Sequence, residues 1–249
     1  MTNIQRSLEE KFRDAGGKRL YVQRLFGRIA RIYDLLNRLM SFGLDRHWRA
    51  FAARYLELRT GEVGLDLGTG TADLSIAVIR RSQPGTRMIG MDITPEMLER
   101  GRIKVARLGL QDRVELRLGD AEHIDLPENS VDGCCSAFMV RNLTDIRQGF
   151  SEMLRVVRPG GRVVCLEISH PPGKIFGFLF HFYFYKVAPL FGTIIGKAFE
   201  EYNYLPNSLT TFPDPPALKA IMEEVGWHDV HFYRLSRGMV AVHAGTKPE

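Results

Sequence analysis

The chain has few cysteines and no apolar leader at its beginning. Its 249 residues include three cysteines, Cys134, Cys135 and Cys165, and each lies in an apolar run typical of a strand. Adjacent residues of a strand point to opposite faces, so a disulfide framework is not expected, and the spacing matches no metal site. The first 14 residues are polar and mixed in charge, unlike a signal peptide. We therefore expect a protein of the reducing cytoplasm.

A long apolar run occurs at residues 175–199, which are dense in aromatic side chains. The run is long enough to raise the question of a transmembrane helix. It contains His181, Lys186, Pro189 and several glycines, which disfavour a membrane span. We interpret it as a lid or substrate channel, with a pair of core helices as the alternative.

The formal net charge of +5 is unevenly distributed along the chain. Residues 1–60 contain 13 Lys and Arg against 6 Asp and Glu, a balance of +7. Basic helices beside apolar ones fit an anionic membrane surface, where each nearby cation contributes about 1 kcal/mol. A solubilising face is the alternative. No nucleic acid is expected as a partner, because the aromatic run is not interleaved with Lys or Arg.

Helix and strand patterns alternate through the middle of the chain. Apolar residues recur at three- and four-residue steps over Tyr21–Met40, which predicts an amphipathic helix with a possible interruption, and Asp45 is placed to cap a second helix. Strands are predicted at 62–67, 87–91, 113–118, 131–138 and 162–168, helices at 71–80, 94–109, 146–157 and 216–225, a tight turn at 158–161 and a hairpin over 228–245. This alternation predicts a doubly wound parallel sheet that ends in an antiparallel hairpin.

The domain organisation follows from these elements. Residues 1–60 are expected to form a helical cap that closes over the site, or else a packing pair that shields one edge of the sheet. Residues 61–249 are expected to form one α/β domain, and residues 170–212 an apolar insertion within it.

The stretch VGLDLGTGTAD at residues 63–73 ends a strand in an acid and continues into a loop with two glycines. Gly68 and Gly70 allow a sharp turn and the close approach of a ligand. A dinucleotide site would carry a third glycine where this chain has Asp73, which would repel a pyrophosphate. S-adenosylmethionine has no phosphate and a cationic sulfonium, so acids near the loop favour it as the cofactor.

Polar residues after three successive strands complete this candidate cofactor site. Asp66 is expected to order the loop or to reach the amino-acid end of the cofactor through water, and Thr71 to offer its hydroxyl and amide to the methionine carboxylate. Asp92, about 20 residues past the loop, suits the ribose hydroxyls. Asp120 is expected to accept from the adenine amino group, and the Ala121 amide to donate to the ring.

Several segments resemble the ubiquinone/menaquinone biosynthesis C-methyltransferases. They are YDLLNRLMSFGLDRHWR (33–49), DLGTGTADL (66–74), MDITPEML (91–98), GDAEHIDLP (119–127), FMVRNLTD (138–145), MLRVVRPGGR (153–162) and EEYNYLPNSL (200–209). The resemblance covers about residues 20–246. It implies a class I S-adenosylmethionine-dependent methyltransferase fold, Rossmann-like, with a mostly parallel seven-stranded sheet. It also implies methyl transfer to a ring carbon of a polyprenyl quinol such as demethylmenaquinol.

Three residues depart from the pattern of that family. Ala72 and Met139 stand where the family often has glycine, so the turn into the next helix is expected to pack more tightly and the pocket to be narrower. Ala137 stands where serine is common, and a side-chain contact to the cofactor is expected to be lost there or to pass to Ser136. None of these changes touches the ribose or adenine acids.

Arg141 and Asn142 follow the fourth strand, where the methyl group should emerge. Arg141 is interpreted as stabilising a developing phenolate or orienting a water that takes the proton. The alternative is that it pairs with Asp145 or another carboxylate and holds the loop. Tyr33 and Tyr202 lie in family motifs and are further catalytic candidates. Asn37, His181, Tyr183, Tyr185 and Tyr204 are weaker pocket candidates. His123 is expected to be a surface residue, or to support the site from behind, rather than to act as a base.

A polyprenyl quinol lives in the bilayer, and the aromatic run suits its isoprenoid tail. We therefore expect a cytoplasmic protein that contacts the membrane surface peripherally, with a second copy as a possible partner. One alternative is a methyltransferase for a small soluble aromatic or another lipid. Another is a non-catalytic subunit of a quinone-biosynthesis complex.

Overall fold

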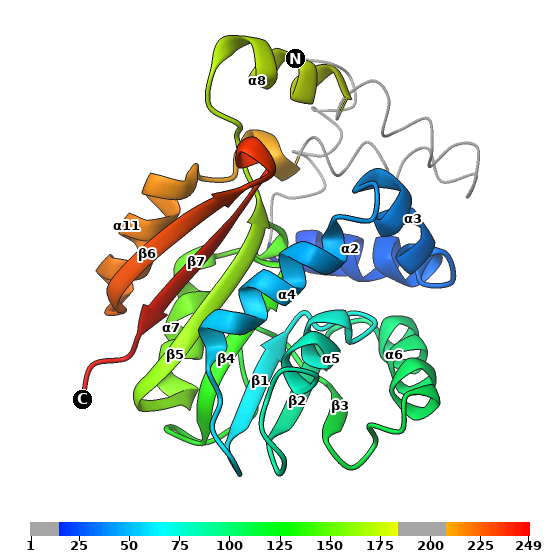
Figure 1. The fold of residues 1–249 in the computed structure, drawn as a ribbon, viewed down its shortest axis with the longest axis vertical. Helices are drawn as coiled ribbons and strands as arrows, with labels where there is room; N and C mark the ends of the chain where they lie inside the picture. The colour runs from blue at the N-terminus through cyan, green and yellow to red at the C-terminus, as the bar shows by residue number, and fades with distance from the viewer. Residues whose placement is uncertain (1–14, 184–207) are drawn as a thin grey trace.

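The described strands form one seven-stranded sheet in the order β3-β2-β1-β4-β5-β7-β6 (Figure 1). The computed structural model describes residues 15–183 and 208–249. The strands are β1 (Val63–Leu67), β2 (Arg87–Asp92), β3 (Val114–Leu118), β4 (Val131–Ala137), β5 (Val157–Ile168), β6 (His228–Leu235) and β7 (Val240–Thr246). β1 to β5 pair in parallel, whereas β7 pairs antiparallel with both β5 and β6. The predicted α/β fold class, with its terminal hairpin, is confirmed.

Helices cover both faces of this sheet. Three of them, α4 (Asp45–Leu56), α5 (Asp73–Ile79) and α6 (Pro95–Arg107), pack on one face, and α7 (Ile146–Val156) and α11 (Pro215–Val225) pack on the other. The neighbours Cys134 and Cys135 belong to the two different cores, as expected for adjacent strand residues. All three cysteines are free and buried.

The N-terminal helices lie above the carboxyl ends of the strands. The pattern predicted over Tyr21–Met40 is interrupted, with α2 at Ala15–Ile29 and α3 at Tyr33–Met40. Buried residues of both helices form a third core with Met97 of α6. The prediction that Asp45 caps the next helix is wrong. Asp45 is the first residue of α4, and its carboxylate binds Arg49 at 2.8 Å instead.

The turn predicted at 158–161 is part of β5 rather than a separate connection. The register of β4 and β5 shifts between Val131 and Gly133, so the extra residues form a bulge. Gly160 has a φ of +74°, and a Cβ on Gly161 would lie 2.6 Å from the Asp132 carbonyl oxygen. The two glycines therefore allow the bulge to pass close to its neighbour strand.

The remaining described helices flank the site. They are α8 (Lys174–Phe182) and the short 3₁₀ turns η1 (Val140–Asn142) and η3 (Ser236–Gly238). None of the helices within the described ranges combines the length and hydropathy that a membrane crossing requires. Much of the aromatic run, together with Tyr185, Tyr202 and Tyr204, lies outside the described residues. The division into a cap and a main domain stays a prediction.

Candidate cofactor and substrate site

Two carboxylates at the ends of adjacent strands, the buried Asp66 and the partly buried Asp92, hold the glycine loop. Oδ2 of Asp66 accepts hydrogen bonds from the Thr69 hydroxyl at 2.7 Å and from the Ser75 hydroxyl and amide at 2.7 and 3.0 Å. Asp92 accepts from the Gly70 amide through Oδ2 and from the Thr94 amide through Oδ1, each at 2.8 Å. These bonds join the loop after β1 to the end of β2.

Burial raises the pKa of both acids. Burial raises the pKa of Asp66 to about 6, although its hydrogen bonds to Ser75 and Thr69 act in the opposite direction. Its second oxygen, Oδ1, is buried without a hydrogen-bond partner among the described residues. Burial also raises the pKa of Asp92, against the opposing effect of the backbone amides that it binds.

The loop backbone is left-handed at three positions, which opens a cavity above it. Gly68, Gly70 and Ala72 have φ angles of +62°, +54° and +68°. A Cβ on Gly68 would lie 2.1 Å from Cγ of Met139, so the absence of a side chain at this position is required by packing. Ala72 is fully buried. Its left-handed backbone carries a steric strain between Cβ and the backbone that a glycine at this position would avoid.

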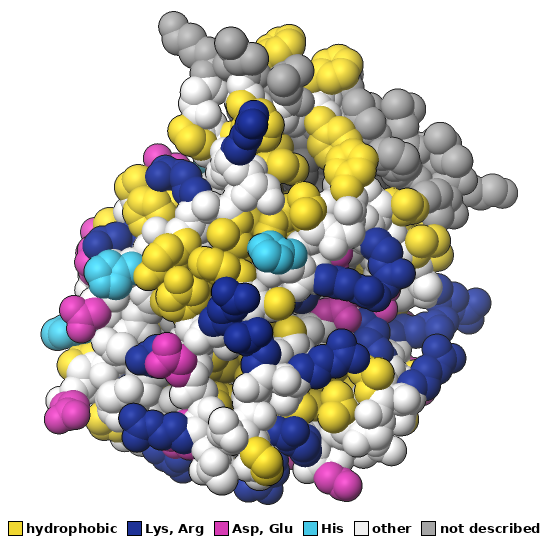
Figure 2. Space-filling view, viewed as in Figure 1, with side chains coloured by type: hydrophobic (Ala, Val, Ile, Leu, Met, Phe, Trp, Pro, Cys, Tyr) yellow, Lys and Arg dark blue, Asp and Glu magenta, His cyan; other side chains and the backbone are white. Residues whose placement is uncertain are grey.

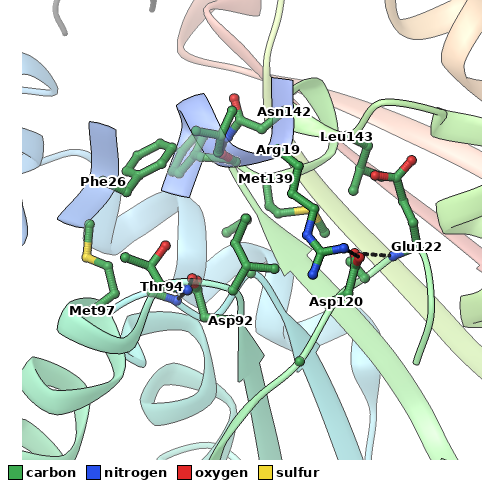
Figure 3. Close-up of a pocket in the computed structure, with 18 of the residues that line it drawn as sticks. Arg19, Phe26, Asp92, Thr94, Met97, Asp120, Glu122, Met139, Asn142 and Leu143 are labelled. Atoms are coloured by element: carbon green, nitrogen blue, oxygen red, sulfur yellow. Dashed lines mark hydrogen bonds and ion pairs between the residues drawn. The ribbon is translucent and has the colours of Figure 1, made fainter. Parts of the chain in front are cut away.

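The first cavity has a volume of about 710 Å³ and lies at the carboxyl ends of β1, β2 and β4 (Figure 3). Its walls include most of the predicted cofactor residues. These are Gly68, Gly70, Asp92, Asp120, Ala121 and Ala137, together with the catalytic candidates Tyr33 and Asn142. Open α/β sheets bind ligands in this crevice.

Helix α2 forms the outer wall of the first cavity. Arg19 extends from α2 to Asp120, with Nη1 and Oδ2 2.8 Å apart (Figure 3). The Gln23 amide donates to the Ile93 carbonyl at 2.8 Å, and the Lys18 ammonium donates to the Leu143 carbonyl. Helix α2 therefore contacts residues on several sides of this cavity, and closure of the N-terminal segment over the site stays a prediction.

Three predicted cofactor residues, Thr71, Ser136 and Asp66, lie outside the cavity walls. Thr71 is buried, and its hydroxyl donates to Asp34 at 2.6 Å while it accepts from the Lys104 ammonium at 2.8 Å. Ser136 is buried with its hydroxyl unpartnered among the described residues. Asp66 lies beneath the loop rather than in its cavity, which fits the first of its two predicted roles.

A second cavity, of about 950 Å³, adjoins the first and is mainly apolar. Phe26, Tyr33 and Phe138 line both cavities. Phe138 has a φ of +60°, and two guanidinium groups lie near its ring, with Arg49 at 5.2 Å and Arg141 at 6.0 Å from its centroid. This strained aromatic residue therefore stands between the two spaces.

The catalytic candidate Arg141 lines the second cavity. Its Nη1 contacts Oε2 of Glu167 at 2.7 Å, and both side chains are almost fully buried. The prediction that Arg141 pairs with Asp145 is wrong, because the Asp145 carboxylate caps α7 by accepting from the Arg147 and Gln148 amides. The alternative, a pair with another carboxylate, is confirmed by Glu167. Sequence reasoning missed Glu167. A single acid in the apolar strand sequence VVCLEI was the available signal.

Tyr33 lies where the two cavities meet. Burial raises the pKa of its phenol, whereas the positive charges of Arg49 and Arg141 and the neighbouring Asn37 act to lower it. Asn37 and Tyr183 also line the second cavity, and the Tyr183 hydroxyl donates to the Met40 carbonyl at 2.8 Å. The side chain of His123 is 80% exposed, as expected for a surface residue.

The residues of the first cavity fit S-adenosylmethionine. Asp92 and Asp120 present acceptors on its floor, and the acidic character of the site suits a cationic ligand without phosphate. Gly70 has no side chain, and the atom nearest to a Cβ added there would be 3.9 Å away. A ligand therefore has room against the backbone at this position.

Comparison with known proteins agrees with this geometry. The chain matches the ubiE/COQ5 methyltransferase family over residues 13–247. It belongs to this family. The predictions of an S-adenosylmethionine-dependent methyltransferase, and of its family, are therefore confirmed.

Individual relatives are similar over nearly their whole length. The chain is 39% identical over 226 residues to the ubiquinone/menaquinone biosynthesis C-methyltransferase UbiE of Geobacter sp. (strain M21), which covers 91% of this chain and 96% of that one. It is 40% identical over 224 residues to the demethylmenaquinone methyltransferase of Thermus thermophilus, with 90% and 100% covered. A SAM-dependent methyltransferase from Aquifex aeolicus shares the fold, with a TM-score of 0.55 at 19% identity over 79% of this chain and 88% of that one.

A substitution at Gly68 tests the close packing of the loop. Gly68→Ala is expected to raise the dissociation constant of S-adenosylhomocysteine at least tenfold, measured by calorimetry, because the methyl group forces Met139 away from its place in the cavity wall. Gly109→Ala is the matched control, since its φ of +65° imposes the same backbone strain where no atom lies within 4 Å. Equal affinities in the two variants would contradict this account of the loop.

The raised pKa of Asp66 predicts a pH-dependent stability. The folded state holds this proton more tightly than the unfolded state, so the free energy of unfolding should fall as the pH rises from about 4 to about 6, by about 3 kcal/mol. Asp66→Asn keeps an acceptor oxygen but cannot titrate, and it should lack this decrease. Urea unfolding at several pH values measures it, and identical pH profiles for the two proteins would refute the assignment.

Proposed function

We propose that the protein transfers a methyl group from S-adenosylmethionine to a ring carbon of a polyprenyl quinol, with demethylmenaquinol as the substrate. The observation that carries this proposal is the pair of adjoining cavities. One is polar at its floor and fits the cofactor, and the other is apolar with a buried guanidinium in its wall. The names of the relatives at 39% and 40% identity support the same substrate class.

Each group of residues has a part in this proposal. Asp92 holds the ribose hydroxyls, and Asp120 and the Ala121 amide hold the adenine. Gly68 and Gly70 let the methionine end approach the backbone, while Asp66 supports the loop from beneath. The Thr71 amide and the Ala137 backbone stay in the proposal. The side chains of Thr71 and Ser136 do not line the cavity, and the Thr71 hydroxyl bonds to Asp34 and Lys104 instead.

S-adenosylmethionine, when bound, supplies an electrophilic methyl group. The ring carbon becomes nucleophilic when a neighbouring ring hydroxyl gives its proton to a water molecule. After the carbon has accepted the methyl group, it releases its own hydrogen as a proton to water, which restores the aromatic ring. Arg141 is placed to donate to the developing phenolate oxygen, and Asn142 lies beside the first cavity after the same strand. Tyr33, with its raised pKa, keeps its proton and can donate to the same oxygen. Tyr202 remains a catalytic candidate outside the described residues.

The mouth of the second cavity suits the apolar tail of the substrate. Phe180 of α8 and Tyr183, the residue after α8, line the cavity, and the ring centroids of Phe42 and Tyr183 are 5.6 Å apart. Phe42 is 71% exposed and Phe178 is 70% exposed. We infer that this apolar rim meets the inner face of the membrane, so that the tail stays in the bilayer while the ring enters the protein.

Charge near the rim supports the same inference. Arg31, Arg38 and Arg46 are exposed on and beside α3. Figure 2 shows Lys and Arg side chains gathered on this part of the surface, close to apolar ones. A basic surface around an apolar rim favours anionic lipid.

A homodimer also remains part of the proposal, and light scattering would measure it.

Methylation of the quinol tests the proposed function directly. Anaerobic incubation with S-adenosylmethionine and demethylmenaquinol should yield menaquinol, detected by mass spectrometry. Arg141→Met should lower kcat by about 10²-fold while the affinity for S-adenosylhomocysteine changes little, because a donor to the phenolate is lost. Asp145→Asn is the control, since asparagine also caps a helix, and it should keep kcat within twofold.

Two outcomes would contradict that proposal. Unchanged turnover of Arg141→Met would remove Arg141 from the mechanism. Equal kcat/KM for a tail-less naphthalenediol and for demethylmenaquinol would indicate a small soluble aromatic as the substrate instead.

Vesicle binding tests the membrane contact. The protein should sediment with vesicles of phosphatidylcholine containing phosphatidylglycerol, and less with phosphatidylcholine alone. The double variant Phe42→Ser, Phe178→Ser should weaken binding at least tenfold, because two apolar side chains no longer leave water. Leu108→Ser, at an exposed position after α6, should bind like the unmodified protein. Equal binding by all three would refute the docking face.

A further inference from the structure

Glu167 binds Arg141 through both of its carboxylate oxygens. Oε2 contacts the guanidinium Nη1 at 2.7 Å, and Oε1 accepts from the Arg141 backbone amide at 3.3 Å. The exposed fractions of the side chains are 1% for Glu167 and 4% for Arg141. One carboxylate thus holds both the backbone and the side chain of the residue that follows β4. The pair is rigid and shielded from water.

The wall of the second cavity carries no net charge in its described part. Its charged residues there are Asp45 and Arg141. Asp45 is paired with Arg49 at 2.8 Å, and Arg141 is paired with Glu167. Each positive charge is therefore matched by a buried negative charge. A ligand in this space would contact a mainly apolar wall whose two charged residues are each neutralised by a partner.

The same wall keeps hydrogen-bond donors for a ligand. Nε of Arg141 and Nδ2 of Asn37 are buried, and neither has a hydrogen-bond partner among the described residues. Both residues line the second cavity. A buried donor without a partner is costly, so these groups suit a ligand that brings oxygen acceptors.

We propose that Glu167 is a specificity-determining positioning residue, which neutralises Arg141 so that the second cavity selects an uncharged hydroxylated aromatic ring over a ring that bears a carboxylate. This proposal rests on the proposed function of the site. A guanidinium without its partner would attract a carboxylate strongly in such a dry space. With Glu167 in place, a ligand carboxylate would bring a second negative charge to a guanidinium that is already matched. The Arg141 Nε–H then remains as a donor to a phenolic oxygen.

Binding of two stable probes tests this selection without requiring methyl transfer. The probes are 1-naphthol and 1-hydroxy-2-naphthoate, titrated in the presence of S-adenosylhomocysteine and followed by fluorescence. The unmodified protein should prefer 1-naphthol at least tenfold. Glu167→Gln should reduce this preference at least tenfold by binding the carboxylate probe more tightly. Glu167→Asp keeps the charge and should keep the preference within about threefold.

Control variants separate charge from packing. The double variant Arg141→Met, Glu167→Met replaces the buried pair with apolar side chains, a change that proteins often tolerate. It should keep the preference for 1-naphthol but bind it at least tenfold more weakly, and it stays informative if Glu167→Gln does not fold. Asp132→Asn removes a carboxylate paired with Arg158 at the far end of β4, and it should leave both affinities unchanged.

The outcomes distinguish this inference from the proposed function. If Glu167→Gln weakens both probes equally, or if the unmodified protein binds both equally, the role of Glu167 is overturned while the ring site stands. If the double variant binds the carboxylate probe as tightly as 1-naphthol, the role is likewise overturned. If the unmodified protein binds neither probe, the second cavity is not a ring site and the proposed function itself fails.

Discussion

The hydrogen bonds that two carboxylates accept from the glycine loop and its neighbours are the constraint on which the site depends. Asp66 and Asp92 end neighbouring parallel strands, so their side chains reach the same loop from beneath and from beside it. Each donor of the loop would otherwise be buried without a partner, at a cost of about 1–3 kcal/mol. Gly68 and Gly70, whose backbone is left-handed, line the first cavity, and this cavity forms above a loop that has little freedom to move.

A second constraint joins this cavity to its neighbour. Phe138 follows β4 with a left-handed backbone, and the guanidinium groups of Arg49 and Arg141 both lie near its ring. Each arginine has its own buried carboxylate, which lets two positive charges lie close to one ring. The result is an aromatic partition between a polar space and an apolar one. Methyl transfer to the ring of a lipid requires a polar cofactor and an apolar substrate to lie side by side, because positioning the two reactants supplies much of the catalysis.

The sequence predicts those parts of the site that depend on strand order alone. Gly68, Gly70, Asp92 and Asp120 follow strands whose carboxyl ends must meet, and the structure brings them to one cavity. Side chains whose direction depends on tertiary partners were not predictable. The Thr71 hydroxyl turns to Asp34 and Lys104, which come from distant helices. Glu167 was missed because its role depends on Arg141, 26 residues away in the chain.

A crystal structure with S-adenosylhomocysteine and 1-naphthol would test the central claim most directly, because it places both ligands at once. The account predicts the ribose at Asp92, the adenine beside Asp120 and Ala121, and the naphthol ring in the second cavity, with its oxygen at Arg141 and Phe138 between the two ligands. A ribose bound away from Asp92, or a ring bound outside the second cavity, would contradict it.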